Sequence, residues 1–173
     1  MEKKYRLLEN DTITVGNRTL YRIEALRDFA DVEKGDKGGY VESEDNLSHD
    51  GNCWVYGNAR VCGDAWVYGD ARVYGNAWVY GDAWVYGNAH VSGNAKVSGN
   101  ADYYVGKNVW SSGRYFTYTR SNRMWKVGCF YGTGEELIEK AYKDSKVSGR
   151  EYERVVRYVE AMYADLEKDN SKN

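Results

Sequence analysis

The sequence is short of the residues that usually build metal sites and disulfide frameworks. Among 173 residues it has only three cysteines, Cys53, Cys62 and Cys129, and two histidines, His49 and His90. The cysteines form no C-x-x-C pair, and the histidines do not complete a ligand set at metal-binding spacing. We therefore expect free thiols in a reducing compartment, with no metal and no cofactor.

Long apolar runs and familiar catalytic signatures are also missing. The first residues, "MEKKYRLLEN", contain no apolar signal region, and no run approaches the roughly 18 apolar residues of a membrane span. There is no GxSxG, phosphate-loop or HExxH motif. The net charge of −2 points to no particular partner. These absences favour a soluble cytoplasmic protein without catalytic residues.

What the sequence does have is a six-residue phrase that recurs eight times between residues 49 and 102. Each copy has a valine, a glycine two residues later, then asparagine or aspartate, then alanine. Valine suits the inside of a short strand, and glycine with Asn or Asp suits a corner, because these residues tolerate positive φ. The valines are Val55, Val61, Val67, Val73, Val79, Val85, Val91 and Val97.

Three phrases close a triangular coil with a period of 18 residues, and successive coils then stack about 4.8 Å apart. The repeat thus predicts a parallel β-solenoid of about three coils. The stretch "VSGNAKVSGNA" (Val91–Ala101) resembles the hexapeptide-repeat proteins, and this resemblance implies a left-handed β-helix.

Different patterns flank the repeat, so we expect three domains: residues 1–48 as a β segment and cap, 49–110 as the solenoid, and 111–173 as a hairpin with helices. "TITVG" and "TLYRIEA" surround Gly16 and Asn17 and predict an N-terminal β-hairpin. The fold class expected is mostly β, with two α-helices at the C-terminal end.

The C-terminal region shows one hairpin pattern and two helix starts. "RYFTYTRSNRMWKVGCFYG" predicts a β-hairpin that turns near Ser121 and Asn122. "TGEE" (Thr133–Glu136) and "SGRE" (Ser148–Glu151) have the capping-box pattern and predict the first residues of two helices.

The 18-residue period aligns large aromatic side chains on one outer face of the solenoid. Stacked aromatics can simply stabilise a sheet, or they can form a subunit contact, where Tyr and Trp are enriched, or a ligand platform. We favour a homo-oligomer, a trimer or a dimer, whose interface is formed by Trp66, Tyr68, Trp84, Tyr86 and Tyr104.

A basic and aromatic segment follows the repeat, because no acidic residue lies between Asp102 and Glu135. Arginine binds phosphate through a planar fork and aromatic rings stack on bases, so the segment suits an anionic ligand. The segment could instead bind an acidic surface of another protein. A third interpretation is a solvated hairpin whose cations meet the acidic helices while its aromatics fill a small core. The candidate ligand-binding residues are Arg114, Tyr115, Tyr118, Arg120, Arg123, Trp125, Lys126, Arg150 and Arg154.

The chain as a whole resembles small open reading frames of phages and prophages, which are labelled transferases or polymer-forming proteins from their repeats. The shared phrases are "LYRIEALRDF", "GGYV", "NLSHDGNCWVY" and "GCFYGT". The resemblance implies a phage-encoded protein in the cytoplasm of a bacterial host cell. We expect a non-enzymatic binder that counters antiviral defence by sequestering a nucleotide-derived signal.

Two alternatives stay open. The first is an inhibitor that binds a host defence protein directly. The second is an acyl-CoA-dependent acyltransferase of the hexapeptide-repeat type, in which His49 or His90 would have to serve as the base.

Overall fold

The computed structural model describes residues 2–173 and divides into two compact units that meet after Tyr103. The first unit contains the N-terminal strands together with the solenoid, and the second runs from Tyr104 to Asn173. The division falls before residue 110, where the sequence placed the solenoid's end, because Tyr103–Lys107 form a strand of the C-terminal sheet.

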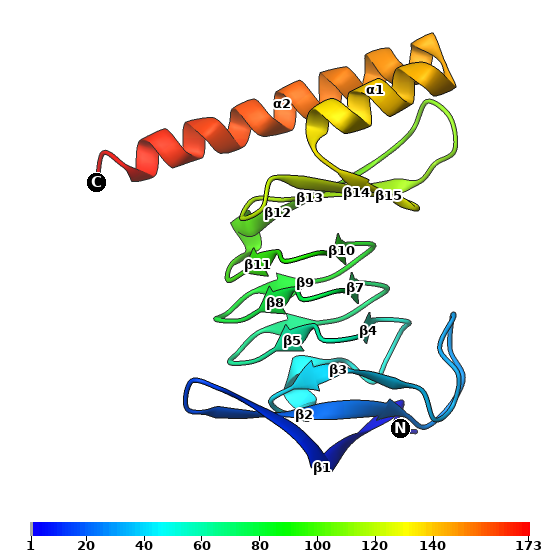
Figure 1. Ribbon diagram of the computed structural model, residues 1–173, viewed down its shortest axis with the longest axis vertical. Coiled ribbons are helices and arrows are strands. Elements are labelled where there is room, and N and C mark those ends of the chain that lie inside the picture. The colour runs from blue at the N-terminus through cyan, green and yellow to red at the C-terminus, as the bar shows by residue number, and fades with distance from the viewer. Residues whose placement is uncertain (1) are drawn as a thin grey trace. The chain divides into compact units, whose positions relative to one another are not determined.

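The solenoid consists of two-residue strands connected by tight corners. Figure 1 shows the coils stacked on one another. Residues 18 apart pair in parallel: Arg60 faces Trp78, and Trp66 faces Trp84. The parallel β-solenoid of about three coils expected from the repeat is therefore confirmed. The strands are β4 (Trp54–Val55), β5 (Arg60–Val61), β6 (Trp66–Val67), β7 (Arg72–Val73), β8 (Trp78–Val79), β9 (Trp84–Val85), β10 (His90–Val91) and β11 (Lys96–Val97).

The inside of the coils contains the valine and alanine of every phrase, and all of them are buried. The corner glycines adopt positive φ, for example +69° at Gly63. A Cβ atom on Gly63 would also lie 3.2 Å from the carbonyl oxygen of Gly81 in the next coil. Glycine is therefore needed here both for the turn and for the close stacking of corners.

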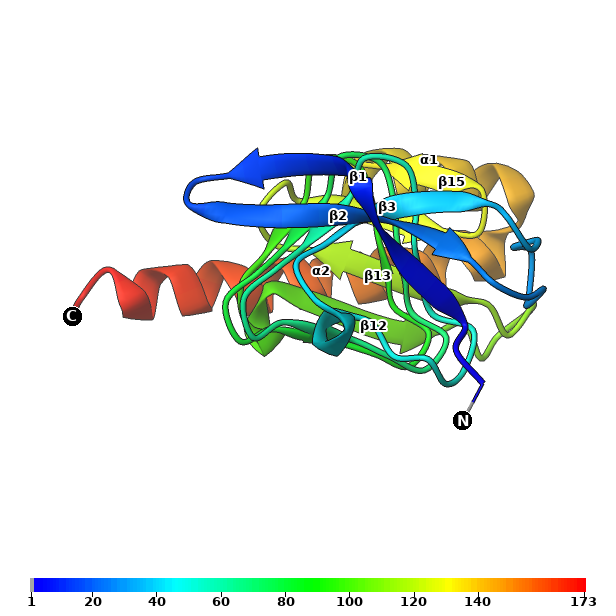
Figure 2. The ribbon, with the colours of Figure 1, turned by 90° about the horizontal axis from the view of Figure 1, so that it is seen from below.

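Three N-terminal strands extend the stack of coils (Figures 1 and 2). β1 (Tyr5–Val15) and β2 (Arg18–Ala25) form the expected antiparallel hairpin, with a register shift between Leu8 and Thr12. β3 (Lys37–Val41) pairs with β2 on one side and in parallel with β5 on the other. The end strand of the coils is thus covered by the chain itself, which limits edge-to-edge association.

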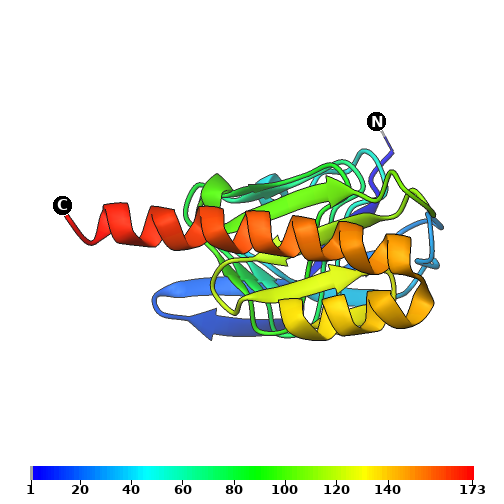
Figure 3. The same cartoon turned by 90° about the horizontal axis from the view of Figure 1, so that it is seen from above.

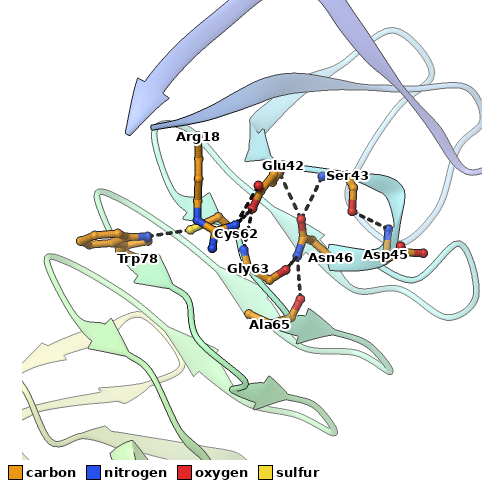
Figure 4. A network of polar contacts seen from close by, with 9 residues as sticks. All are labelled: Arg18, Glu42, Ser43, Asp45, Asn46, Cys62, Gly63, Ala65 and Trp78. Carbon is orange, nitrogen blue, oxygen red and sulfur yellow. Dashed lines mark hydrogen bonds and ion pairs between the residues drawn. The ribbon is translucent and has the colours of Figure 1, made fainter. Parts of the chain in front are cut away.

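A 3-10 turn, η1 (Glu44–Asn46), is tied to the first coil by one buried side chain (Figure 4). The Asn46 amide donates to the carbonyl oxygens of Gly63 and Ala65, at 3.0 and 2.8 Å. Its Oδ1 atom accepts from the backbone N–H groups of Glu42 and Ser43. Four backbone groups are satisfied by a single asparagine.

Lys4 is fully buried beside the first regular coil. Its Nζ atom donates to the Cys53 carbonyl oxygen at 2.9 Å and lies 3.3 Å from the Cys53 sulfur. Burial lowers the pKa of Lys4 and raises the pKa of Cys53. The ring of Trp54, also buried, packs edge-on against Phe29 and Tyr5.

The C-terminal unit is a four-stranded sheet with two helices on one face (Figures 1 and 3). The expected hairpin is confirmed: Tyr118 pairs with Trp125, and the turn contains Ser121 and Asn122. η2 (Asn100–Asp102) lies at the end of the first unit, and the elements that follow are β12 (Tyr103–Lys107), β13 (Tyr115–Thr119), β14 (Met124–Val127), β15 (Phe130–Gly132), α1 (Gly134–Asp144) and α2 (Lys146–Asn170).

One predicted helix start is correct and the other is wrong. Thr133 caps α1 and forms the capping box with Glu136. α2 is capped instead by Ser145, whose Oγ atom accepts from the N–H of Ser148 at 3.0 Å, so Ser148 already lies within the helix. Within residues 2–173, no helix is both long enough and apolar enough to cross a membrane.

Candidate functional site

The C-terminal unit contains a cavity of about 430 Å³. It is formed by the loop between β12 and β13, the β14–β15 turn, α1 and the beginning of α2. This volume falls in the usual range of small-molecule sites, about 300–1,000 Å³. The lining residues that the chemistry below uses are Asn108, Ser112, Arg114, Phe130, Lys140 and Tyr152.

Asn108 organises the loop on one side of the cavity, and it is only 3% exposed. Its backbone N–H donates to the Arg114 carbonyl oxygen at 2.8 Å, which closes the loop. Its side-chain oxygen accepts from the N–H of Ser111 at 2.9 Å, and its amide donates to the Tyr152 hydroxyl at 3.2 Å. The loop is therefore held to α2 by a buried hydrogen-bond network.

Arg114 brings a positive charge to the cavity. Among the described residues its guanidinium has no hydrogen bond and no carboxylate partner, and the side chain is exposed. It runs beside Gly128, where φ is +54° and a Cβ atom would lie 3.1 Å from Nη1. The positive φ of the turn therefore favours glycine at position 128, and a Cβ atom there would also displace the arginine slightly.

The N-terminal end of α2 forms another wall, since Ser145 and Ser148 line the cavity. The first turn of a helix presents N–H groups and the positive end of the helix dipole. The first turn of α2 contains no acidic residue, whereas that of α1 contains Glu135 and Glu136. A negative group in the cavity would therefore meet a helix end without an acidic side chain in its first turn, next to Asp144 and the capping hydroxyl of Ser145.

The remaining lining residues supply hydroxyls and an apolar floor. Lys140 is already paired with Asp144 at 3.3 Å, so the two charges largely offset one another. Burial raises the pKa of Tyr152, which keeps its hydroxyl protonated. With Phe130 below and hydroxyls around it, the cavity can hold a small molecule that has both a flat apolar part and an anionic part.

The sequence-based site needs correction at two residues. Tyr118 and Trp125, which we expected to contact a ligand, are 3% and 0% exposed and belong to the core beneath the helices. Side chains alternate between the two faces of a strand, and both residues point toward the helices. The Trp125 indole donates to Glu160 on α2 at 3.1 Å.

The other expected ligand-binding residues do not gather in one place. Arg123 pairs with Glu167, and Arg150 and Arg154 both pair with Glu151. The Arg123 contact matches the reading in which the hairpin cations meet the acidic helices, whereas Arg150 and Arg154 pair within α2 itself.

The remaining candidates lie on or beside the hairpin. Arg120 lies over the ring of Tyr163, with 5.9 Å between the guanidinium carbon and the ring centroid. Tyr115 is exposed beneath the ammonium group of Lys107, and Lys126 occupies β14 opposite Thr117. Of the nine residues predicted, only Arg114 lines the cavity.

Sequence reasoning missed most of the cavity, because its polar groups come from four separate segments. The loop "KNVWSSGR" carried one available signal, an asparagine followed by two serines and a glycine, which is typical of a hydrogen-bonded turn. Tyr152 packs in the core of the C-terminal unit, and its hydroxyl accepts from the Asn108 amide.

The aromatic residues of the solenoid do align as the period requires. Tyr68 and Tyr86 stack with ring centroids 5.1 Å apart, and Trp66 and Trp84 are 37% and 48% exposed. Tyr104 does not continue this row, since it lies on β12 and packs against the core of the C-terminal unit. The homo-oligomer expected from this face stays a prediction.

The family model that matches this chain covers only part of the solenoid. A family model described as the YdcK beta-solenoid repeat matches residues 55–69, 65–81 and 71–87. The "Uncharacterized acetyltransferase YdcK" of Escherichia coli (strain K12) is 39% identical over 61 residues, which is 31% of this chain and 19% of that protein. The chain thus spans about a fifth of the length of this curated relative. The repeats are similar to the YdcK beta-solenoid repeat over these residues.

That relative is named an acetyltransferase, and in an enzyme of this type His49 or His90 would have to serve as the base. His49 stacks on Tyr5, and its Nδ1 atom accepts from the backbone N–H of Lys4 at 3.1 Å. Its Nε2 atom faces Glu44 at 3.4 Å, so both ring nitrogens are engaged within the fold. His90 is half-buried and lies edge-on to Tyr74. Within residues 2–173, no three His, Cys, Asp or Glu side chains come together as a metal site.

Proposed function

We propose that the protein is a non-enzymatic binder that holds a small, anionic, nucleotide-derived molecule in the cavity of its C-terminal unit. One observation carries this proposal: the unpaired guanidinium of Arg114 faces the same 430 Å³ cavity as the N-terminal end of α2. Both features favour a phosphate, and Phe130 offers a surface for a base.

The resemblance to phage and prophage reading frames supplies the biological setting of the proposal. A small phage protein in the cytoplasm of an infected bacterium that removes a nucleotide signal would silence the defence that depends on the signal. The YdcK-type solenoid then acts as a rigid support, and the C-terminal unit provides the binding site.

The test is isothermal titration calorimetry of the full chain against cyclic mononucleotides, cyclic dinucleotides and ADP-ribose derivatives. We expect at least one of these to bind, and Arg114→Ala to weaken that binding by about tenfold or more, as losing a charge-assisted hydrogen bond would. Lys126→Ala is the matched control, because Lys126 is a cation of the same unit, on β14, that does not line the cavity. Equal losses in both variants, or no binding by any class, would refute the proposal.

An acyltransferase is the second candidate, and the printed name of the Escherichia coli relative is the observation that favours it. It predicts release of free coenzyme A from acetyl-CoA with a suitable acceptor, and loss of that release in His90→Ala. The observation against it is that His49 is already engaged on both sides of its ring.

A further inference from the structure

The solenoid has three outer faces, and N-terminal residues cover aromatic side chains on two of them but leave those on the third exposed. Trp54, on the first face, is buried beneath Phe29 and Tyr5. Trp78, on the second, packs with residues of the N-terminal hairpin and donates to the sulfur of Cys62 (Figure 4). The aromatic face, which we define as Trp66, Tyr68, Trp84 and Tyr86, has three side chains between 37% and 48% exposed.

The aromatic face also differs from the other two in charge, because aspartates lie at its corners and no cation lies on it. The corners of the solenoid carry either Asn or Asp after glycine, and the three aspartates all lie at corners that bound the aromatic face: Asp64, Asp70 and Asp82. The fourth corner of this face carries Asn88, and the corners that do not bound it carry Asn58, Asn76 and Asn94. No cation occupies an outward position on the aromatic face, whereas Arg60, Arg72, His90 and Lys96 occupy those of its neighbours.

An acidic hollow of about 390 Å³ adjoins the edge of this face, next to Trp66. Figure 4 shows the parts of the chain that line it, which are Arg18 and the segments from Glu42 to Asn46 and from Gly63 to Ala65. Glu42 is paired with Arg18 at 2.8 Å. Asp45 and Asp64 are exposed and have no ion pair or side-chain hydrogen bond among the described residues.

We propose that the aromatic face, with its rim of Asp45, Asp64, Asp70 and Asp82, is a docking surface for a cationic, arginine-bearing segment of another protein. Arginine is the side chain that both parts of the surface attract. Its guanidinium packs over Trp and Tyr rings and forms charge-assisted hydrogen bonds with carboxylates.

A second copy of the chain that presented the same face would bring the acidic rims together, and the one cation that lines the hollow, Arg18, is already paired with Glu42. Such symmetric pairing is therefore the less favourable occupant. The docking surface is independent of the cavity, since all of its residues belong to the first compact unit.

The repeat itself supplies variants that should preserve the fold. Arg60 and Arg72 occupy the same slot as Trp84, so Trp84→Arg is compatible with the coil. Asn58 and Asn76 likewise show that Asp64→Asn with Asp82→Asn is compatible with the corners.

The probe is a short fluorescent peptide of alternating arginine and glycine, with a counterpart in which citrulline replaces arginine. We expect the arginine peptide to bind the full chain, and Trp84→Arg and the Asp64→Asn, Asp82→Asn pair each to weaken binding by about tenfold. The control pair Asp165→Asn, Asp169→Asn on α2 changes the net charge equally and should leave affinity within about twofold.

Three outcomes would overturn the proposal. The first is equal binding of the citrulline peptide, or no binding of either peptide. The second is an equal loss in the control pair, which would indicate unspecific attraction. The third is a self-associated wild-type protein that becomes monomeric on sedimentation when Trp84→Arg is introduced, because the occupant would then be a second copy.

Discussion

Trp66 and Trp84 lie directly opposite each other on β6 and β9, with ring centroids 6.1 Å apart and ring planes at 89°. They are 18 residues apart, and the sequence alone places them in the same slot of adjacent coils. Their neighbours Val67 and Val85, one residue later, are fully buried. Adjacent positions on one strand therefore face solvent and core in turn, and substitutions at the two positions should differ in their effect on the free energy of unfolding.

Trp84→Arg should change the free energy of unfolding by about 1 kcal/mol or less, since it removes only exposed aromatic pairs. Val85→Ala should cost about 2 kcal/mol, because it leaves space in a tightly packed coil. Urea denaturation of both variants checks the contrast. A larger loss for Trp84→Arg than for Val85→Ala would contradict the assigned inside and outside positions.

Asn46→Ala should destabilise the protein by about 2–4 kcal/mol, because it leaves buried backbone groups of η1 and the first coil without partners. Asn58→Asp is the control: Asn58 is an exposed corner residue at a place where other phrases carry aspartate. We expect that control to be neutral within about 0.5 kcal/mol in the same denaturation experiment. A neutral Asn46→Ala would show that the hydrogen bonds are dispensable.

Lys4→Met should cost about 1–3 kcal/mol, since methionine fills the same space but cannot donate to the Cys53 carbonyl oxygen. The neighbouring Lys3 is exposed and pairs with Glu44 at 2.8 Å, so Lys3→Met should cost about 1 kcal/mol or less. Thermal and urea unfolding of the two variants compare a buried with an exposed ammonium group. Equal effects would argue against a structural role of the buried one.

For Gly149→Ala the structure predicts a loss of stability, where helix propensity alone would predict a gain. Alanine is about 1 kcal/mol better than glycine inside an ordinary helix. Here a Cβ atom would lie 2.2 Å from the ring of Tyr142, so we expect destabilisation instead. The double variant Tyr142→Ala, Gly149→Ala should recover part of the loss, and a stabilised single variant would show that α1 and α2 are not packed this closely.

Structural features that repeat along the chain could be predicted from the sequence, and features that occur once were harder to predict. The register of Arg60 with Trp78 follows from the period, because eight copies of one phrase agree on it. The cap of α2 does not follow in the same way. Ser145 and Ser148 both stand where a capping serine could, and Gly149 is needed for the packing of Tyr142 rather than for a helix start.

The candidate site was harder to predict than the fold. The composition of residues 103–134 indicated a basic and aromatic segment, but composition does not say which face of a strand carries a side chain. Tyr118 and Trp125 face the helices, whereas Arg114 lies in the loop before β13 and reaches the cavity. Partners such as Asn108 and Tyr152 are brought together only by the tertiary fold.

Recovery of the ligand itself is the most direct test of the proposed binding function. The wild-type chain and an Arg114→Glu variant would be purified from phage-infected, defence-active bacteria, denatured, and the released small molecules compared by mass spectrometry. We predict that the wild-type protein releases a nucleotide-derived species that the variant, still folded by circular dichroism, does not. No such species from the wild-type protein, or equal amounts from both, would contradict a nucleotide site at Arg114.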